Sequence, residues 1–266
     1  MNTVEKRMVS ILRDLRENHG AYSVKAEFEA EGTRLEELLR LKEITLTAEL
    51  GLTLKIGGCE SVRDILEIQR VGVNYLVAPM IESAYALRKY LQAVDKFFPA
   101  DERGNTEILC NIETKDGYES LDEILSVPEI NSLNGVIVER VDLCLSYGRD
   151  EDKIDDEETN KAVEDMIRKI RGRGLAASIA GGVSANSLPF FQRLGNFMDR
   201  YETRKMCFKY DPEQINQSEK GILKALGFEV LWLKNKINYE EGIVNNDKKR
   251  IMMIEQRYWN AIESLI

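Results

Sequence analysis

Two acidic residues end neighbouring β-rich runs of the sequence. Glu113 follows the run ILCNI and precedes a helix start at Asp116, and Asp142 holds the matching place after the next run, GVIVERV. Carboxylates from adjacent strands can share one hard divalent cation, with waters and substrate oxygens completing an octahedron. The pair therefore predicts a site for Mg²⁺ or Mn²⁺. The alternative is that each carboxylate caps a helix or forms a surface ion pair.

Further charged residues interrupt other β-rich runs. Glu27 and Glu29 lie in the first run, Lys55 near the end of the second, and Arg204 and Lys205 in the seventh. Side chains alternate along a strand, so only one of Arg204 and Lys205 can face inward. We expect the acids and bases of these runs to form a ring at one end of the fold. Glu29, Lys55 and Arg204 are the candidate catalytic residues of this ring.

Two pairs of glycines stand where strands give way to helices. Gly57-Gly58 precedes one helix pattern, and Gly181-Gly182 with Ser184 precedes another. Glycine lets the backbone approach a ligand closely, and the free N–H groups of a helix start attract anions. We expect these five residues to bind substrate, although a Gly-Gly turn also occurs without any ligand.

Short β-rich runs alternate with helical patterns along the whole chain. This alternation is typical of parallel strands joined by crossover helices. Eight such units predict a single-domain (β/α)₈ TIM barrel over residues 1–266, with an open doubly wound sheet as the rival fold. The expected strands are 24–29, 52–58, 75–83, 107–114, 135–143, 175–183, 201–208 and 228–234.

Both ends of the chain have helical patterns. The N-terminal run MNTVEKRMVSILRDLREN is amphipathic, and a last helix is expected over about residues 247–266. That helix has more apolar residues than one barrel-facing stripe needs, including Ile251, Ile254, Trp259 and Ile266. Excess apolar surface favours a homo-oligomer that this helix helps to assemble. Packing of the helix on its own barrel is the alternative.

Composition excludes several classes of partner. The 266 residues have a net charge of −9 and a pI of about 5.0, so no fold-wide basic surface for nucleic acid is expected. The chain contains neither an 18-residue apolar run nor the apolar core of a signal peptide. We therefore expect a soluble cytoplasmic protein without a membrane partner. The four cysteines lack CxxC spacing and suit buried reduced thiols.

One family shares these motifs. NIETKDGYESLDEILSVPEINSLNGVIVERVDLCLSYG resembles the metal-binding half of the HpcH/HpaI aldolase/citrate lyase family, and VGVNYLVAPMIESAYALRKYL resembles an upstream segment of it. The resemblance implies a barrel in which Glu113 and Asp142 hold a divalent metal. It also implies a carbon–carbon lyase of EC class 4.1 that acts through the enolate of pyruvate or a related small 2-keto acid, the metal serving as Lewis acid. Related barrels pack C-terminal helices across subunits, which again favours a homo-oligomer.

The chain departs from the family pattern at three places. Ala30, in AEFEAEG, stands where family aldolases have the histidine of proton transfer. Lys55 matches a substrate-binding arginine, and can hold a carboxylate only as a compact charge. Glu139-Arg140 replaces the Gly-Pro of the second metal motif. The only histidine, His19, lies earlier and is expected in a loop or cap.

Three functions agree with these features. The first is the metal-dependent lyase or aldolase. The second is a transferase that condenses a pyruvate- or phosphoenolpyruvate-derived enolate with an activated acceptor, which the loss of the histidine favours. The third is a non-catalytic barrel that binds a ligand, although the retained Glu113 and Asp142 argue against it.

Overall fold

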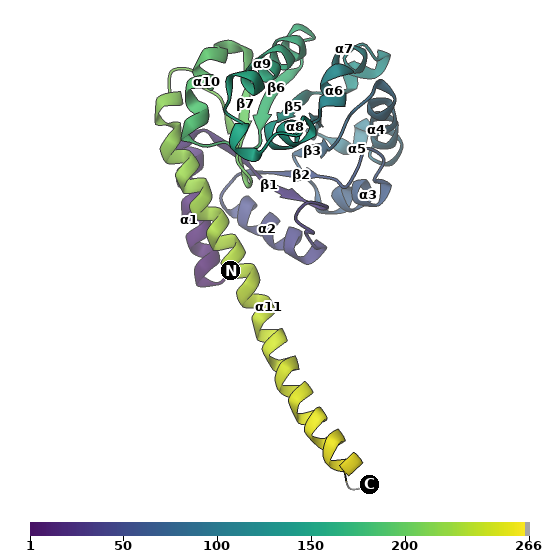
Figure 1. Ribbon diagram of the computed structural model, residues 1–266, viewed down its shortest axis with the longest axis vertical. Helices are drawn as coiled ribbons and strands as arrows, with labels where there is room; N and C mark the ends of the chain where they lie inside the picture. Colours follow the sequence, from purple (N-terminus) through teal and green to yellow (C-terminus); the bar gives the residue numbers. More distant parts are fainter. Residues whose placement is uncertain (264–266) are drawn as a thin grey trace.

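Eight strands close into a barrel in the order in which they occur along the chain (Figure 1). The computed structural model describes residues 1–263, without the side chains at positions 102, 216, 261 and 262. The closed barrel with alternating helices confirms the predicted fold class. Its strands are β1 (Ala21–Glu27), β2 (Gly51–Lys55), β3 (Tyr75–Ala78), β4 (Glu107–Ile112), β5 (Gly135–Glu139), β6 (Ala176–Ala180), β7 (Arg200–Glu202) and β8 (Met206–Lys209).

The last strand of the barrel runs in the opposite direction to the other seven. β1 to β7 pair in parallel, whereas β8 is antiparallel to both β7 and β1. The prediction of one strand over 201–208 is therefore wrong, because the chain reverses within it. Thr203 makes the turn: its N–H donates to the carbonyl of Met206 at 2.9 Å, and its hydroxyl accepts from the N–H of Met206 at 3.2 Å.

The predicted eighth strand, residues 228–234, is helical and lies inside α11 (Ser218–Glu263). Its aromatic and β-branched residues are typical of a strand, but they are spaced for a helix. Ile222, Ala225, Phe228 and Trp232 recur every three or four residues and are all buried. The last helix thus begins well before the predicted position 247; Ile266 lies outside the described residues.

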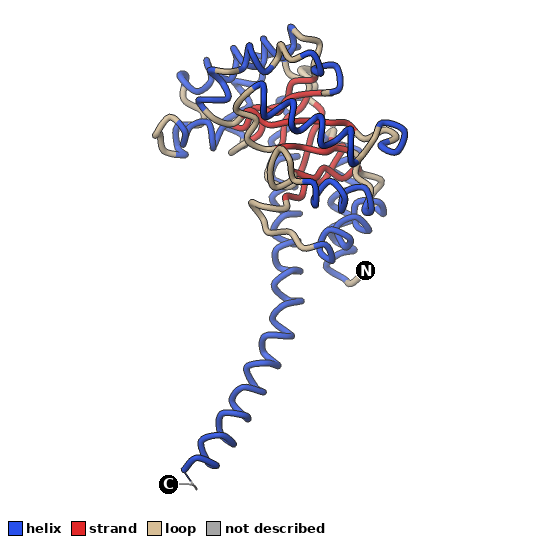
Figure 2. The backbone as a smooth tube through the Cα atoms, turned by 90° about the vertical axis from the view of Figure 1, so that its right-hand side faces the viewer, coloured by secondary structure: helices blue, strands red, loops and turns tan. Residues whose placement is uncertain are grey.

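Helices cover the outside of the barrel, and the second half of α11 leaves it entirely (Figures 1 and 2). The predicted N-terminal helix is present as α1 (Thr3–His19), which packs against the first half of α11. No helix of the described residues is long and apolar enough to cross a membrane. The remaining helices are α2 (Leu35–Thr47), α3 (Val62–Val71), α4 (Ala84–Phe97), α5 (Ala100–Arg103), α6 (Lys115–Glu119), α7 (Leu121–Ile124), α8 (Arg140–Ser146), α9 (Glu157–Gly172) and α10 (Leu188–Leu194).

The barrel interior changes from apolar to charged along its axis. Val77, Leu109, Ile137 and Ala180 form an apolar cluster inside the barrel. At the N-terminal end of the strands, the Arg200 guanidinium lies over two tyrosine rings and pairs with a carboxylate of β4 at 2.8 Å. The base is therefore closed, and the polar residues at the carboxyl ends of the strands form the only charged mouth of the described barrel.

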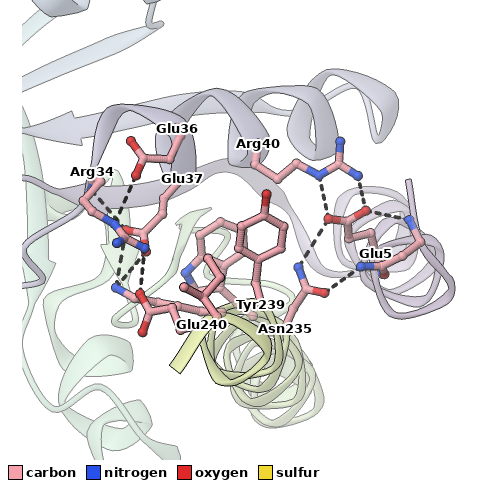
Figure 3. Close-up of a pocket in the computed structure, with 12 residues that line it drawn as sticks. Glu5, Arg34, Glu36, Glu37, Arg40, Asn235, Tyr239 and Glu240 are labelled. Carbon is pink, nitrogen blue, oxygen red and sulfur yellow. Dashed lines mark hydrogen bonds and ion pairs between the residues drawn. The ribbon is translucent and has the colours of Figure 1, made fainter. Parts of the chain in front are cut away.

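A buried ion pair joins the two terminal helices to α2. The Glu5 carboxylate accepts from Nε of Arg40 at 2.6 Å and from Nδ2 of Asn235 at 3.2 Å (Figure 3). The hydrogen bonds from Arg40 lower the pKa of Glu5 to about 2, although burial opposes them. Glu5 thus links α1, α2 and α11 through one carboxylate.

Replacing Glu5 by glutamine should destabilise the protein in a pH-dependent way. The pKa of Glu5 is lower in the folded protein than in the unfolded chain, so the ionised carboxylate stabilises the fold at pH values above the unfolded pKa. This stabilisation is lost as the pH falls from about 4.5 towards 2. We expect Glu5→Gln to cost about 1–3 kcal/mol at pH 7 and much less near pH 3. Urea unfolding at both pH values measures this. Glu17→Gln, at an exposed ion pair, is the control and should cost under about 0.5 kcal/mol.

Candidate metal centre

Glu113 is fixed at the mouth directly after β4. Its side chain is buried, with Oε1 accepting from the N–H of Met80 at 2.7 Å and Oε2 from Nδ2 of Asn111 at 2.8 Å. Met80 has φ of +51°, a left-handed conformation that non-glycine residues rarely adopt. A donor from the loop after β3 and a donor from β4 therefore hold this carboxylate in one orientation.

Glu139 and Asp142 come from the junction of β5 and α8. Glu139 ends the strand and caps the helix, its Oε2 accepting from the N–H of Asp142 at 2.7 Å. Asp142 lies in the first turn of α8, because β5 ends sooner than the predicted strand 135–143. One carboxylate oxygen each of Glu113, Glu139 and Asp142 lies within 4.8 Å of the other two, the one such acidic group among the described residues.

The environment of the Glu139 carboxyl disfavours its charged form. Burial raises its pKa to about 7, and the charges of Asp142 and Glu113 add to this, against the hydrogen bond from the Asp142 amide. Three buried or partly buried carboxylates that converge repel one another unless a cation or protons neutralise them. Oxygen ligands at this spacing fit a hard divalent cation such as Mg²⁺ or Mn²⁺.

Asn111 was not singled out from the sequence. It is fully buried two residues before Glu113 and orients that carboxylate, while its own Oδ1 has no hydrogen-bond partner in the described structure. A buried acceptor without a donor is costly, so this atom points to a donor supplied by bound water or ligand. The period of two along β4 puts Asn111 on the same face as Leu109, which is the signal that could have found it.

A buried chain of charges lines the other side of the mouth. Lys25 lies between Glu27, at 3.3 Å, and Glu202, at 3.2 Å, and Lys55 approaches the second oxygen of Glu27 at 3.5 Å. Burial alone would lower the pKa of Lys25, but the two carboxylates outweigh burial and raise it. Lys25 and Glu202 are additions to the sequence prediction. Lys55, nearest the solvent of the two lysines, shares its carboxylate with Lys25.

Arg204 and Lys205 lie in the turn between β7 and β8 instead of on one strand. Both pair with Glu31 from the loop after β1. The Lys205 side chain is 4% exposed, whereas that of Arg204 is 50% exposed. Burial lowers the pKa of Lys205, although Glu31 opposes the shift. Of the two residues, Lys205 is the buried cation of the mouth and Arg204 lies on its rim.

Glu29 and the first glycine pair lie against each other at the rim. A side chain at Gly57 would come within 2.9 Å of the Glu29 carboxyl carbon, so the Glu29 side chain would have to move aside. The Gly57 N–H donates to Asp64 at 2.8 Å and is therefore not available to a ligand in this conformation. This contact limits the predicted anion-binding role of Gly57, and leaves Gly58 as the candidate of the pair.

The second glycine pair lies beside a buried arginine, Arg140, and forms a hydrogen bond with it. The Gly181 carbonyl accepts from Nη2 of Arg140 at 2.9 Å, and the same guanidinium reaches Asp155 at 2.7 Å and Ser187 at 2.9 Å. Gly181 and Gly182 both have positive φ. Ser184 caps the short helix that follows, accepting from the N–H of Asn186 at 3.2 Å. Arg140, the residue in place of the family proline, thus ties β5 to the loop after β6.

The histidine predicted in a loop or cap ends α1, at the opposite end of the barrel from the carboxylates. Its Nε2 lies 3.0 Å from Nζ of Lys224 on α11. Burial and this lysine lower the pKa of His19. The cysteines are all free thiols, as predicted; three are buried, and Cys59 is partly exposed.

Comparison with known proteins defines the class of this chain. The family model described as HpcH/HpaI aldolase/citrate lyase matches residues 41–187, more than half of the sequence. The chain therefore belongs to the HpcH/HpaI aldolase/citrate lyase family, a family of aldolase- and lyase-type enzymes, as the sequence motifs predicted. No curated protein sequence matches it.

Solved structures show the same fold at low identity. An HpcH/HpaI aldolase from Desulfitobacterium hafniense DCB-2 has a TM-score of 0.58 and 15% identity over 82% of this chain and 88% of its own. A family protein from Burkholderia cenocepacia J2315 has a TM-score of 0.56 and 12% identity over 89% and 99%. A variant of the citrate synthase SbnG has a TM-score of 0.54 and 13% identity over 81% and 97%.

Gly181→Ala should disturb the carboxylate group, whereas Gly174→Ala should not. Both residues have φ near +80°, so each alanine costs about 1–2 kcal/mol of backbone strain. A Cβ at Gly181 would also lie 2.7 Å from the Arg140 nitrogen and closer still to the Glu139 carboxylate, while at Gly174 it would meet no atom within 4 Å. We expect Gly181→Ala to unfold at least about 1 kcal/mol more easily in urea than Gly174→Ala. Equal losses in the free energy of unfolding of the two variants would mean that the Glu139 side chain moves aside at no cost.

Proposed function

We propose that this protein is a divalent-metal-dependent carbon–carbon lyase or aldolase that acts through the enolate of pyruvate or a related small 2-keto acid. The observation that supports this most is the convergence of Glu113, Glu139 and Asp142 within 4.8 Å at the mouth. The family membership supports the same reaction class.

Glu113 and Asp142 would hold the cation, and Glu139 adds a third carboxylate where the family pattern has glycine. A bound Mg²⁺ or Mn²⁺ would supply Lewis-acid stabilisation of the enolate. The orientation of Glu113 by Asn111 and by the Met80 N–H means that this ligand does not reorganise when the cation arrives. Pre-oriented ligands of this kind favour binding because their ordering is completed on folding.

The charged residues on the other side of the mouth complete the proposed site. Lys55 would hold the substrate carboxylate as a point charge, since Glu27 is already shared with the more buried Lys25. Glu29, on the rim beside the position of the missing histidine, would take and return the proton of the substrate methyl group. Arg204 would attract the anionic substrate to the rim.

Enolisation is the step that tests this proposal. With pyruvate and Mn²⁺ or Mg²⁺ in D₂O, the methyl protons should exchange for deuterium, as followed by NMR. Asp142→Asn should abolish exchange and weaken Mn²⁺ binding, because it removes a ligand whose side chain has no other described contact. Glu29→Gln should slow exchange while Mn²⁺ affinity, measured by calorimetry, stays the same. Wild-type Mn²⁺ binding without any exchange would leave only the ligand-binding alternative.

Asp142→Asn is a cleaner test of the metal than Glu113→Gln. Glutamine at position 113 could accept only one of the two hydrogen bonds that the carboxylate receives. A buried donor left facing an amide N–H costs about 1–3 kcal/mol. Glu113→Gln should therefore lower the thermal transition as well as the activity, which would confuse the two effects.

Lys55→Met should raise KM for the keto acid strongly, by at least about tenfold, because the loss of a charge-assisted contact costs about 1.5–3 kcal/mol. Steady-state kinetics, or the exchange rate against pyruvate concentration, measures this. Lys42→Met is the control, since that side chain bonds to the Gly72 carbonyl away from the mouth. An unchanged KM in Lys55→Met would remove this residue from the site.

A condensing reaction is the second candidate. The absence of the family histidine changes the proton demands, and one protein of the same fold is a citrate synthase, SbnG. Both reactions need the same enolate, so the exchange assay does not separate them. Adding aldehydes or oxaloacetate to the assay would separate the two reactions. Consumption of pyruvate with an activated acceptor favours the transferase. Cleavage of a 4-hydroxy-2-keto acid favours the aldolase.

A further inference from the structure

The projecting helix has a regular apolar seam that no part of the described chain covers. Along α11, apolar residues recur at the first and fourth positions of successive seven-residue repeats, the pattern of a coiled coil. Each of these side chains is at least 46% exposed. They are Leu223, Leu226, Val230, Leu233, Ile237, Val244, Ile251, Ile254 and Tyr258.

This seam is distinct from the face of α11 that packs on the barrel. Ala225 and Trp232 are two of the buried side chains that face the barrel. Each of these two residues lies one position before a seam residue. One residue is about 100° around a helix. The seam therefore runs beside the barrel-facing stripe and continues beyond the end of the barrel, where α11 projects alone (Figures 1 and 2).

We propose that the seam binds the seam of a second copy of this chain, forming a parallel two-stranded coiled coil along α11. The inference is independent of the reaction that the barrel catalyses. A repeat sustained over five heptads is longer than packing on a single barrel requires, and an exposed apolar stripe of this length normally has a partner. A two-fold axis along the helices would place the two barrels on opposite sides of the coiled coil.

Charges beside the seam are complementary between two copies of this chain in a parallel, in-register pair. In a parallel pair, the residue before each first position lies near the residue five places later in the other helix. Glu229 would meet Lys234, and Arg250 would meet Glu255. Lys236 would also face Glu241, although it already pairs with Glu37 of its own chain at 3.1 Å.

The antiparallel pair that places Glu241 opposite its own counterpart has the opposite electrostatics. It would also bring Lys234 near Lys248 and Lys236 near Arg250. Like charges beside the seam oppose that register, whereas the in-register parallel pair has opposite charges there.

Two acids interrupt the seam at fourth positions. Glu240 is already paired with Arg34 of its own chain at 2.6 Å (Figure 3), and Asp247 is followed by Lys248. Polar residues inside a coiled-coil seam reduce stability but fix the register of the two helices. In a parallel pair each of these acids would face its counterpart in the other helix and repel it. The ion pair with Arg34 neutralises the charge of Glu240.

Sedimentation equilibrium of the full chain tests the partner. Wild type should be a dimer at micromolar concentration, and Ile251→Asp should weaken the dimer at least about a hundredfold, because it puts two charges into the seam. Met253→Asp is the matched control: its side chain is 55% exposed against 53% for Ile251, but it lies off the seam. A monomeric wild type, or equal effects of the two variants, would overturn the proposal.

Disulfide trapping tests the direction. In a parallel pair, residue 244 of one helix lies beside residue 244 of the other, within the Cα separation that a disulfide spans. In a Cys59→Ser background, Val244→Cys should cross-link to a dimer on mild oxidation, and Asn245→Cys, one position off the seam, should not. If Val244→Cys cross-links only when mixed with Glu240→Cys, the helices are antiparallel and the proposed direction is wrong.

Discussion

The mouth of this barrel depends on one constraint: three buried or partly buried carboxylates must stay close together. Backbone and amide N–H groups accomplish this. Glu113 is held by Met80 and Asn111, and Glu139 by the first turn of α8. Each carboxylate that accepts a hydrogen bond is placed by a different part of the barrel. The rigidity of β4, β5 and the loop after β3 therefore determines the geometry of the candidate site.

The exchange of Gly-Pro for Glu139-Arg140 changes both the charge and the packing of the second metal motif. The carboxylate of Glu139 needs Gly181 beneath it, and the guanidinium of Arg140 needs the Gly181 carbonyl and Asp155. The two substitutions thus share one structural requirement, a glycine with positive φ after β6. Asp155, in the acidic stretch 149–158, supplies the counter-charge for the buried arginine.

The sequence was sufficient for the alternation of strands and helices, for the family, and for the acids after β4 and β5. These features depend on local periodicity and on residues next to strand ends, which a single sequence shows. The reversal at Thr203 was not predictable in the same way, because an uninterrupted β-rich run does not show where it turns. Residues 228–234 were mistaken for a strand because their composition favours strands, and burial against α1 decided the helix instead. Lys25 went unnoticed because one of its two carboxylate partners, Glu202, lies on a strand far away in the sequence.

The reversed strand has a topological consequence for everything that follows it. In a barrel of eight parallel strands, the chain leaves the last strand at the mouth, and the final helix returns to the base. Here β8 runs from mouth to base, so α11 starts beside His19 and climbs towards the mouth, passing Lys205 and then Arg34. The inversion of one short strand thus inverts the polarity of the tail. The projecting half of α11 emerges on the side of the candidate metal centre, and whatever binds it stands beside that centre.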